Sequence, residues 1–163
     1  MKATRNPLHA AGRPQRFEES QDSYRAHAHM PDPAKCPRCG AAYLKGRWTW
    51  KAAAADAAEE TCPACQRIED NFPAGYVVFK GPYFAQHRDE ILNVINARAT
   101  HAREEHPMQR IIGMEPVSGG VRVTTTDAHL ARGLAIAVQE AFKGDLDLTF
   151  TKDENLVRAT WSR

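Results

Sequence analysis

The fold is decided by residues 109–142, which read QRIIGMEPVSGGVRVTTTDAHLARGLAIAVQEAF. The segments 109–117 and 121–126 are rich in apolar and β-branched residues, so each of them predicts a strand. The Ser-Gly-Gly sequence at 118–120 predicts a hairpin turn between them, because glycine accepts a positive φ. The stretch therefore begins with two antiparallel strands.

An amphipathic helix is predicted to follow these strands. Thr126 or Asp127 can cap it, because either side chain can accept hydrogen bonds from the first free backbone amides. Gly144 is a C-terminal stop signal. The apolar residues in between recur at helical spacing and predict one buried stripe, made of Leu130, Leu134, Val138, Ala141 and Phe142.

The alternation of strands and helices extends on both sides of this stretch. Upstream, residues 76–80 predict a short strand, and Pro82 predicts the start of one amphipathic helix that ends at His106. Downstream, apolar and polar residues alternate in 146–151 and again in 157–161, which predicts a second hairpin. The apolar residues of the upstream helix are Phe84, Ile91, Ile95, Ala99 and Ala102.

The resulting order over 75–163, β-α-β-β-α-β plus one final strand, is typical of a ferredoxin-like two-layer sandwich of the α+β class. Both helices are expected to cover one face of the sheet. The opposite face is then polar and rich in threonine, and Tyr76 is its aromatic residue. Because base-stacking sheets carry several aromatic residues, we expect this face to be solvated or to dock a protein. The residues expected beneath the helices are Val77, Phe79, Val121, Val123, Leu146, Leu148, Phe150, Val157 and Trp161.

The cysteines predict a metal site. Two residues between thiolates let one tight turn direct both sulfurs at one ion, so two such turns complete a tetrahedral shell. This spacing predicts a zinc ribbon over 35–71, with a hairpin at 41–51. A shell of four thiolates leaves no position for water or substrate, so the Zn²⁺ is predicted to be structural. The four ligands are Cys36, Cys39, Cys62 and Cys65.

Other interpretations of the cysteines remain open. Iron fits four thiolates as zinc does. A disulfide framework is disfavoured because the chain lacks a secretory signal. Two thioredoxin-like redox motifs are disfavoured because neither pair is predicted to open a helix after an apolar strand. His27 and His29 offer further ligands, but two complete cysteine pairs make them unnecessary.

Composition limits the classes of protein to consider. The 163 residues hold 22 Lys and Arg against 20 Asp and Glu, so a net charge of +2 does not predict a globally basic surface. No run approaches the ~18 apolar residues of a membrane span, and a cytoplasmic location is therefore expected. Residues 1–34 lack apolar periodicity and predict a flexible, weakly basic arm, with a short helix at 17–29 as the alternative.

The predicted ribbon concentrates basic and aromatic residues around its hairpin. In an extended segment, period two puts Trp48 and Trp50 on one face and Arg47 and Lys51 on the other. The tryptophans are interpreted either as packing for a small ribbon or as a surface that faces a partner. The candidate residues for contact with RNA are Arg38, Lys45, Arg47, Trp48, Trp50 and Lys51.

Catalytic motifs are scarce. The chain holds neither a Gly-x-x-x-x-Gly-Lys-Ser/Thr phosphate loop nor a Gly-x-Gly-x-x-Gly sequence. Asp127 and His129 offer an acid–base pair, but a capping Asp127 and an exposed His129 explain the same residues. The sequence therefore predicts neither an enzyme nor a small-molecule substrate.

Six motifs stand out: Cys36-Pro-Arg-Cys-Gly, Lys45-Gly-Arg-Trp, Cys62-Pro-Ala-Cys, Phe72-Pro-Ala-Gly-Tyr, Thr124-Thr-Thr-Asp-Ala-His-Leu-Ala-Arg and Asn155-Leu-Val-Arg-Ala-Thr-Trp. Together they resemble a bacterial family, and the resemblance covers roughly residues 35–163. That family is similar to the amino-terminal part of the eukaryotic and archaeal large-ribosomal-subunit export adaptor in its cysteine spacing and α/β pattern. The resemblance implies binding to the large ribosomal subunit during its maturation. The adaptor has more metal-binding cysteines than this chain, and nuclear export is not implied.

Together these observations predict a non-enzymatic, cytoplasmic zinc-ribbon protein that associates with RNA or a ribonucleoprotein. The expected partner is the ribosome or its large-subunit precursor, and no membrane association is expected. The alternative is a protein–protein adaptor that docks through the α+β domain without nucleic acid. Binding that weakens as salt rises would favour RNA, since phosphate contacts release counterions.

Overall fold

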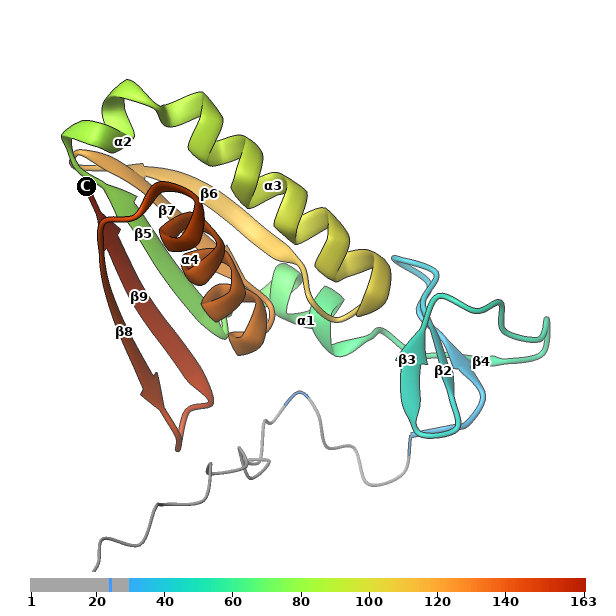
Figure 1. The fold of residues 1–163 in the computed structure, drawn as a ribbon. Coiled ribbons are helices and arrows are strands. Elements are labelled where there is room, and N and C mark those ends of the chain that lie inside the picture. The colour runs from blue at the N-terminus through green and yellow to red at the C-terminus, as the bar shows by residue number, and fades with distance from the viewer. Residues whose placement is uncertain (1–23, 25–29) are drawn as a thin grey trace, which may run out of the picture.

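The computed structural model describes Tyr24 and residues 30–163. Two sheets and four helices make up this part of the chain, with the small sheet set beside the larger α+β body (Figure 1). The helix considered at 17–29, and most of the arm at 1–34, lie outside the described residues. Among the helices in the described ranges, none is long and apolar enough to cross a membrane.

The small sheet has the strand order β3-β2-β1-β4. The hairpin predicted at 41–51 is confirmed as the antiparallel pair β2 and β3, which turns through Lys45 and Gly46 at positive φ. The carboxylate of Asp32 accepts hydrogen bonds from both backbone N–H groups of this turn, at 3.2 and 3.1 Å. The strands are β1 (Ala34–Lys35), β2 (Ala42–Leu44), β3 (Arg47–Thr49) and β4 (Ala58–Glu59).

Helix α1 (Pro63–Asp70) connects the small sheet to the larger one. Cys62 is its N-cap, and the Cys62 Sγ accepts a hydrogen bond from the backbone N–H of Cys65 at 3.3 Å. Pro63 occupies the first helical turn, where no N–H donor is needed. The second cysteine pair therefore opens a helix, but the strand before it, β4, is exposed on both of its residues, so the pattern of a helix that follows an apolar strand is not met.

The large sheet has the strand order β6-β7-β5-β9-β8. The ferredoxin-like order is not confirmed, because the final strand β9 pairs in parallel with β5 and β8 lies at the edge. Burial gives the reason: Trp161 of β9 is fully buried against Phe79, whereas β8 alternates polar, exposed residues with half-buried ones and suits an edge. The strands are β5 (Gly75–Lys80), β6 (Ile111–Val117), β7 (Gly120–Thr125), β8 (Asp145–Thr151) and β9 (Leu156–Ser162).

Three helices connect strands of this sheet (Figure 1). Helices α2 (Pro82–Gln86) and α3 (Arg88–Glu105) lie between β5 and β6, and α4 (Ala128–Phe142) lies between β7 and β8. The single helix predicted from Pro82 to His106 is two helices, because His87 leaves the helical region at φ −120° and ψ 26°. The N–H of Tyr83 donates to the carbonyl of Arg163 at 2.7 Å. This bond ties α2 to the end of the chain, while α3 runs along the sheet.

The core lies between this sheet and its helices. The residues predicted on the inner face of β5 and β7 are fully or nearly fully buried, as are Val157 and Trp161 of β9. Those of β8 are half-buried and pack against the core. One predicted position was wrong: Ala141 is exposed, because Phe142 takes the last place on the stripe of α4 and packs on Tyr83. The buried residues of that stripe are Leu130, Ala131, Leu134, Ala135 and Val138.

Candidate metal centre

The four cysteines converge on one point. Their Sγ atoms all lie within 4.8 Å of one another. The Sγ atoms of Cys39 and Cys62 are 3.7 Å apart, and a regular tetrahedron with metal–sulfur bonds of ~2.3 Å has edges of about 3.8 Å. Cys36 and Cys62 are fully buried, and Cys39 is half-buried. The donor set therefore fits one tetrahedral ion held away from solvent.

Backbone hydrogen bonds shape the turn that holds the first pair, Cys36 and Cys39. The N–H of Cys36 donates to the carbonyl of Ala41 at 2.8 Å, and the N–H of Gly40 donates back to the carbonyl of Cys36 at 3.0 Å. Gly40 closes this turn at φ +80°, a region that other residues seldom adopt. The Sγ of Cys36 also accepts a hydrogen bond from the N–H of Cys62 at 3.3 Å, which links the two pairs.

The environment affects the thiols differently. Burial opposes ionisation of Cys36, but backbone hydrogen bonds from Cys62, Cys39 and Arg38 outweigh it and lower the pKa of this thiol to about 7. Burial raises the pKa of Cys62 and the pKa of Cys65. The pair that opens α1 therefore lacks the lowered thiol pKa that a redox-active pair at a helix N-terminus needs.

The side chain of Arg110 lies directly against this centre, and sequence reasoning missed it. Its guanidinium donates to the Sγ atoms of Cys62 at 3.1 Å, Cys65 at 3.3 Å and Cys39 at 3.6 Å. Burial lowers the pKa of Arg110, but the hydrogen bond to Cys65 and the neighbouring thiols outweigh burial and raise this pKa. The one available signal was charge, because four thiolates around a divalent ion carry a net charge of −2.

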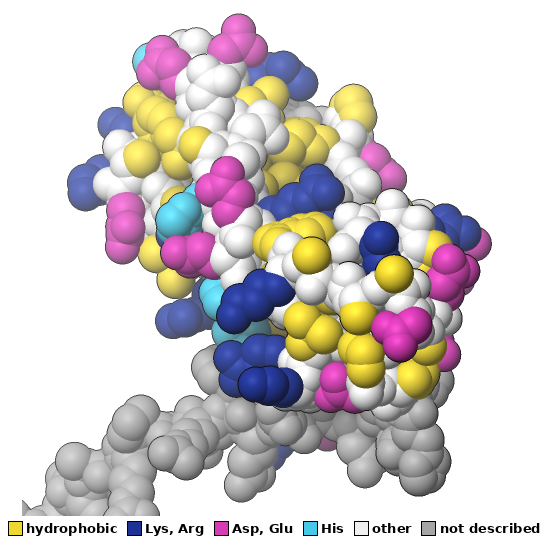
Figure 2. Space-filling model, turned by 90° about the vertical axis from the view of Figure 1, so that its right-hand side faces the viewer, with side chains coloured by type: hydrophobic (Ala, Val, Ile, Leu, Met, Phe, Trp, Pro, Cys, Tyr) yellow, Lys and Arg dark blue, Asp and Glu magenta, His cyan; other side chains and the backbone are white. Residues whose placement is uncertain are grey.

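The basic residues predicted to contact RNA are divided by the structure. Arg38 pairs with Glu69 of α1 at 2.9 Å. Lys45, Arg47 and Lys51 are exposed, and none of them takes part in the ion pairs found among the described residues. Lys and Arg side chains gather along one edge of the ribbon end of the molecule (Figure 2).

The two tryptophans do not share a strand face as predicted, because β3 ends at Thr49. Trp48 is half-buried, packs against the cysteine cluster and lies 5.4 Å from Tyr43 between ring centroids. Trp50 leaves the small sheet, and its indole N–H donates to the carbonyl of Arg103 in α3 at 2.6 Å. Trp50 nevertheless keeps 37% of its surface exposed.

Tyr24 lies on the surface of α1, a contact that no sequence pattern indicated. Its ring lies 5.8 Å from that of Phe72 and 4.4 Å from the guanidinium carbon of Arg67. Its hydroxyl donates to the carboxylate of Asp70 at 2.9 Å. One described residue of the predicted flexible arm is therefore held by three side chains.

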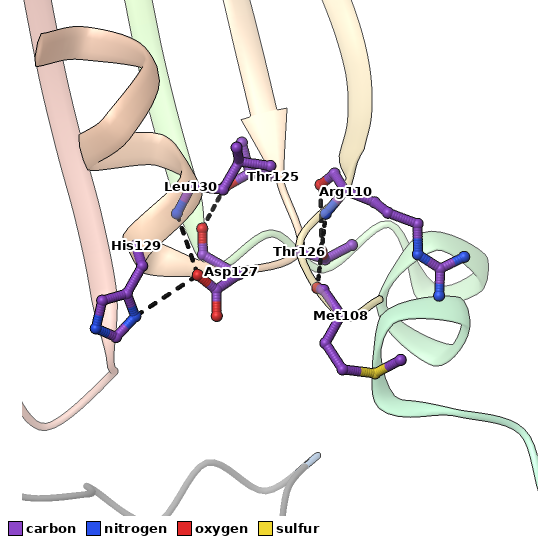
Figure 3. Close-up of polar contacts among 7 residues, drawn as sticks. All are labelled: Met108, Arg110, Thr125, Thr126, Asp127, His129 and Leu130. Carbon is purple, nitrogen blue, oxygen red and sulfur yellow. Dashed lines mark hydrogen bonds and ion pairs between the residues drawn. The ribbon is translucent and has the colours of Figure 1, made fainter. Parts of the chain in front are cut away.

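Asp127 and His129 behave as the structural interpretation of the sequence predicted. The Asp127 carboxylate accepts a hydrogen bond from the N–H of Leu130 at 3.1 Å and so caps α4. The imidazole Nδ1 of His129 lies 3.6 Å from this carboxylate (Figure 3). The His129 side chain is 64% exposed, so it faces solvent and does not lie in an enclosed site.

Comparison with known proteins identifies no relative. No protein-family model matches the chain, and no curated protein or solved structure matches it either.

Proposed function

We propose that the protein is a non-enzymatic zinc protein that associates with RNA or a ribonucleoprotein, with the ribosome or its large-subunit precursor as the partner. Zinc is proposed because four thiolates are its usual structural shell and leave no open position for chemistry. When bound, Zn²⁺ supplies a rigid cross-link between the turn that holds Cys36 and Cys39 and the start of α1. The chain's own residues then determine what the resulting surface contacts.

The observation that carries the RNA proposal is the hairpin between β2 and β3. Lys45, Arg47 and Lys51 are exposed there without acidic partners in the described ion pairs. A bound metal would fix the backbone beneath these cations. They would then contact phosphates with little further loss of backbone conformational entropy. The exposed part of Trp50 adds an aromatic surface for a base. Trp48 contributes packing instead.

The test is charge reversal on the hairpin. Arg47→Glu and Lys51→Glu, singly and together, are to be compared with Arg132→Glu, an exposed arginine of α4 with the same change in charge. Binding to purified ribosomal subunits is measured across salt concentrations. Each hairpin reversal should weaken binding and lower the slope of log Kd against log salt by about 1, whereas Arg132→Glu should leave both unchanged.

Zinc content of each variant is measured alongside, so that a damaged ribbon is not mistaken for a lost contact. Unchanged affinity and slope in zinc-loaded hairpin variants would refute the RNA proposal. Co-migration of the native protein with the large subunit on a sucrose gradient, weakening as salt rises, is the corresponding result expected in a cell lysate.

A protein adaptor remains the second candidate, and the open face of the large sheet favours it. Tyr76 of β5 lies beside Arg158 on this face, with the guanidinium carbon 5.6 Å from the ring. Arg122 on the neighbouring strand pairs with Glu115, so the face mixes charges of both signs. An adaptor would purify without nucleic acid and would bind its partner with weak salt dependence.

A further inference from the structure

Arg110 lies beside the large sheet along the chain, yet its guanidinium contacts the cysteine cluster next to the small sheet. It stands one residue before β6, and its guanidinium donates to three of the four Sγ atoms. Only 7% of its surface is exposed. The cysteine cluster is thus closed on one side by a cation from a distant part of the chain.

Hydrogen bonds to Thr126 hold the backbone of Arg110 in place. The N–H of Arg110 donates to the Thr126 Oγ1 at 2.9 Å, and the Thr126 N–H donates to the Arg110 carbonyl at 2.9 Å. The Thr126 hydroxyl also contacts the carbonyl of Met108 at 2.6 Å (Figure 3). Thr126 lies between β7 and the cap of α4, so the core of the large module positions the guanidinium.

Within the part of the chain that the structure describes, the hydrogen-bond acceptors of the guanidinium are all sulfurs: Nη1 and Nη2 donate to thiol sulfurs, and the buried Nε has no partner there. A buried cation is stable only beside negative charge. Four thiolates and one divalent ion supply a net charge of −2 at that point, which is the charge that a guanidinium complements.

We infer that Arg110 is a positioning residue of the metal centre, through which retention of the ion depends on the folded large sheet. This inference rests on the proposed zinc site and adds a residue outside the shell. The guanidinium holds the sulfurs in place and offsets part of the charge of the metal–thiolate group. Groups that hydrogen-bond to metal ligands commonly change affinity by about 10- to 100-fold when they are removed.

The test measures zinc affinity and thermal stability on the full chain. Arg110→Gln removes the charge, and Arg110→Lys keeps the charge but loses the planar fork. Zinc affinity is measured by competition with a chromophoric chelator, and melting is followed with zinc and after chelation. We expect Arg110→Gln to weaken zinc binding about 10- to 100-fold, with Arg110→Lys between it and the original protein. Arg132→Gln is the matched control on the surface of α4.

Comparing the melting temperatures of the zinc-loaded and the chelated protein separates an effect of Arg110 on the metal centre from a general effect on packing. If Arg110 acts on the metal centre, Arg110→Gln lowers the melting temperature of the zinc-loaded protein much more than that of the chelated protein. An equal drop in both states, with unchanged zinc affinity, would overturn the inference. Absence of zinc binding by the original protein would instead overturn the proposed zinc site itself.

A second variant guards against misfolding of the first. Thr126→Val keeps the volume and removes the hydroxyl that holds the Arg110 backbone. It leaves the guanidinium in the protein, so zinc affinity should fall by less than in Arg110→Gln but more than in Arg132→Gln. A loss of stability in Thr126→Val with wild-type zinc affinity would count against the positioning role.

Discussion

The indole N–H of Trp50 donates a 2.6 Å hydrogen bond to the backbone carbonyl of Arg103. This carbonyl lies in the last turn of α3, where backbone acceptors lack partners within the helix. The guanidinium carbon of Arg103 also lies 5.8 Å from the Trp50 ring. A residue interpreted from sequence as either packing or partner-facing thus joins the small sheet to α3 and still exposes part of its ring.

Replacing Trp50 by phenylalanine tests this joint. Trp50→Phe keeps an aromatic ring but removes the N–H donor, so we expect the free energy of unfolding to fall by about 0.5–1 kcal/mol. Trp50→Ala, which also removes the ring, should cost more. Denaturant unfolding of the zinc-loaded protein measures both. Stability identical to wild type in both variants would show that the contact with Arg103 contributes nothing.

Removing the metal should affect the two sheets unequally. The cysteine cluster has four buried residues, whereas the core of the large sheet is built from residues of five strands and three helices. We therefore expect chelation to unfold β1 to β4 while β5, β7 and β9 stay folded. Amide exchange measured with and without chelator reports each strand, and the start of β6 beside Arg110 should exchange faster. A single cooperative loss of both sheets would contradict this expectation.

Local patterns explain why so much of the fold was predictable. Helical spacing identified the buried residues Ile91 and Ile95. Composition and a glycine turn identified the hairpin of β6 and β7, and alternation identified the hairpin of β8 and β9, because these signals depend on neighbours a few residues away. The capping role of Asp127 has the same local origin. Cysteine spacing likewise identified the four side chains that converge on one point, since the members of each pair are only three residues apart.

Contacts between distant segments were not predictable in this way. Alternation tells which face of a strand is buried but not which strand lies beside it, so the place of β9 next to β5 could not be deduced. Arg110 lies 45 residues from Cys65 along the chain, and several arginines would have satisfied the charge argument equally. The N–H groups of Tyr83 and Phe84 at the start of α2 donate to the carbonyl of the distant residue Arg163, a contact that carries no local signal either.

The cap of α4 gives a pH-dependent contribution to stability. Burial opposes ionisation of Asp127, but the hydrogen bond and charge of His129, and then the N–H of Leu130, outweigh it and lower the pKa of Asp127 below its ordinary value. A lowered folded-state pKa adds stability above the unfolded-state pKa of about 3.9, and this contribution is lost as pH falls through the folded-state value.

Two substitutions of Asp127 separate charge from capping. Asp127→Ala should lower the free energy of unfolding at neutral pH by about 1 kcal/mol, because α4 loses its N-cap. Asp127→Asn keeps an acceptor and should lose less. The deficit of Asp127→Ala should shrink at an acid pH below the lowered folded-state pKa of Asp127, where the wild-type carboxyl is protonated. Urea unfolding at both pH values measures this, and a deficit that does not depend on pH would rule out the charged cap.

The closest approach of β5 to α4 depends on Gly75. A Cβ at this position would lie 2.3 Å from the Cβ of Ala131 and 2.5 Å from the Oγ1 of Thr125, both of which are fully buried. Gly75→Ala must therefore push α4 away from the sheet, and we expect a loss of about 1–3 kcal/mol or more. Gly113→Ala is the matched control, because its Cβ would meet its nearest neighbour at 3.8 Å in ordinary contact. Thermal melting of the two variants should differ clearly, and equal melting temperatures would show that α4 yields without cost.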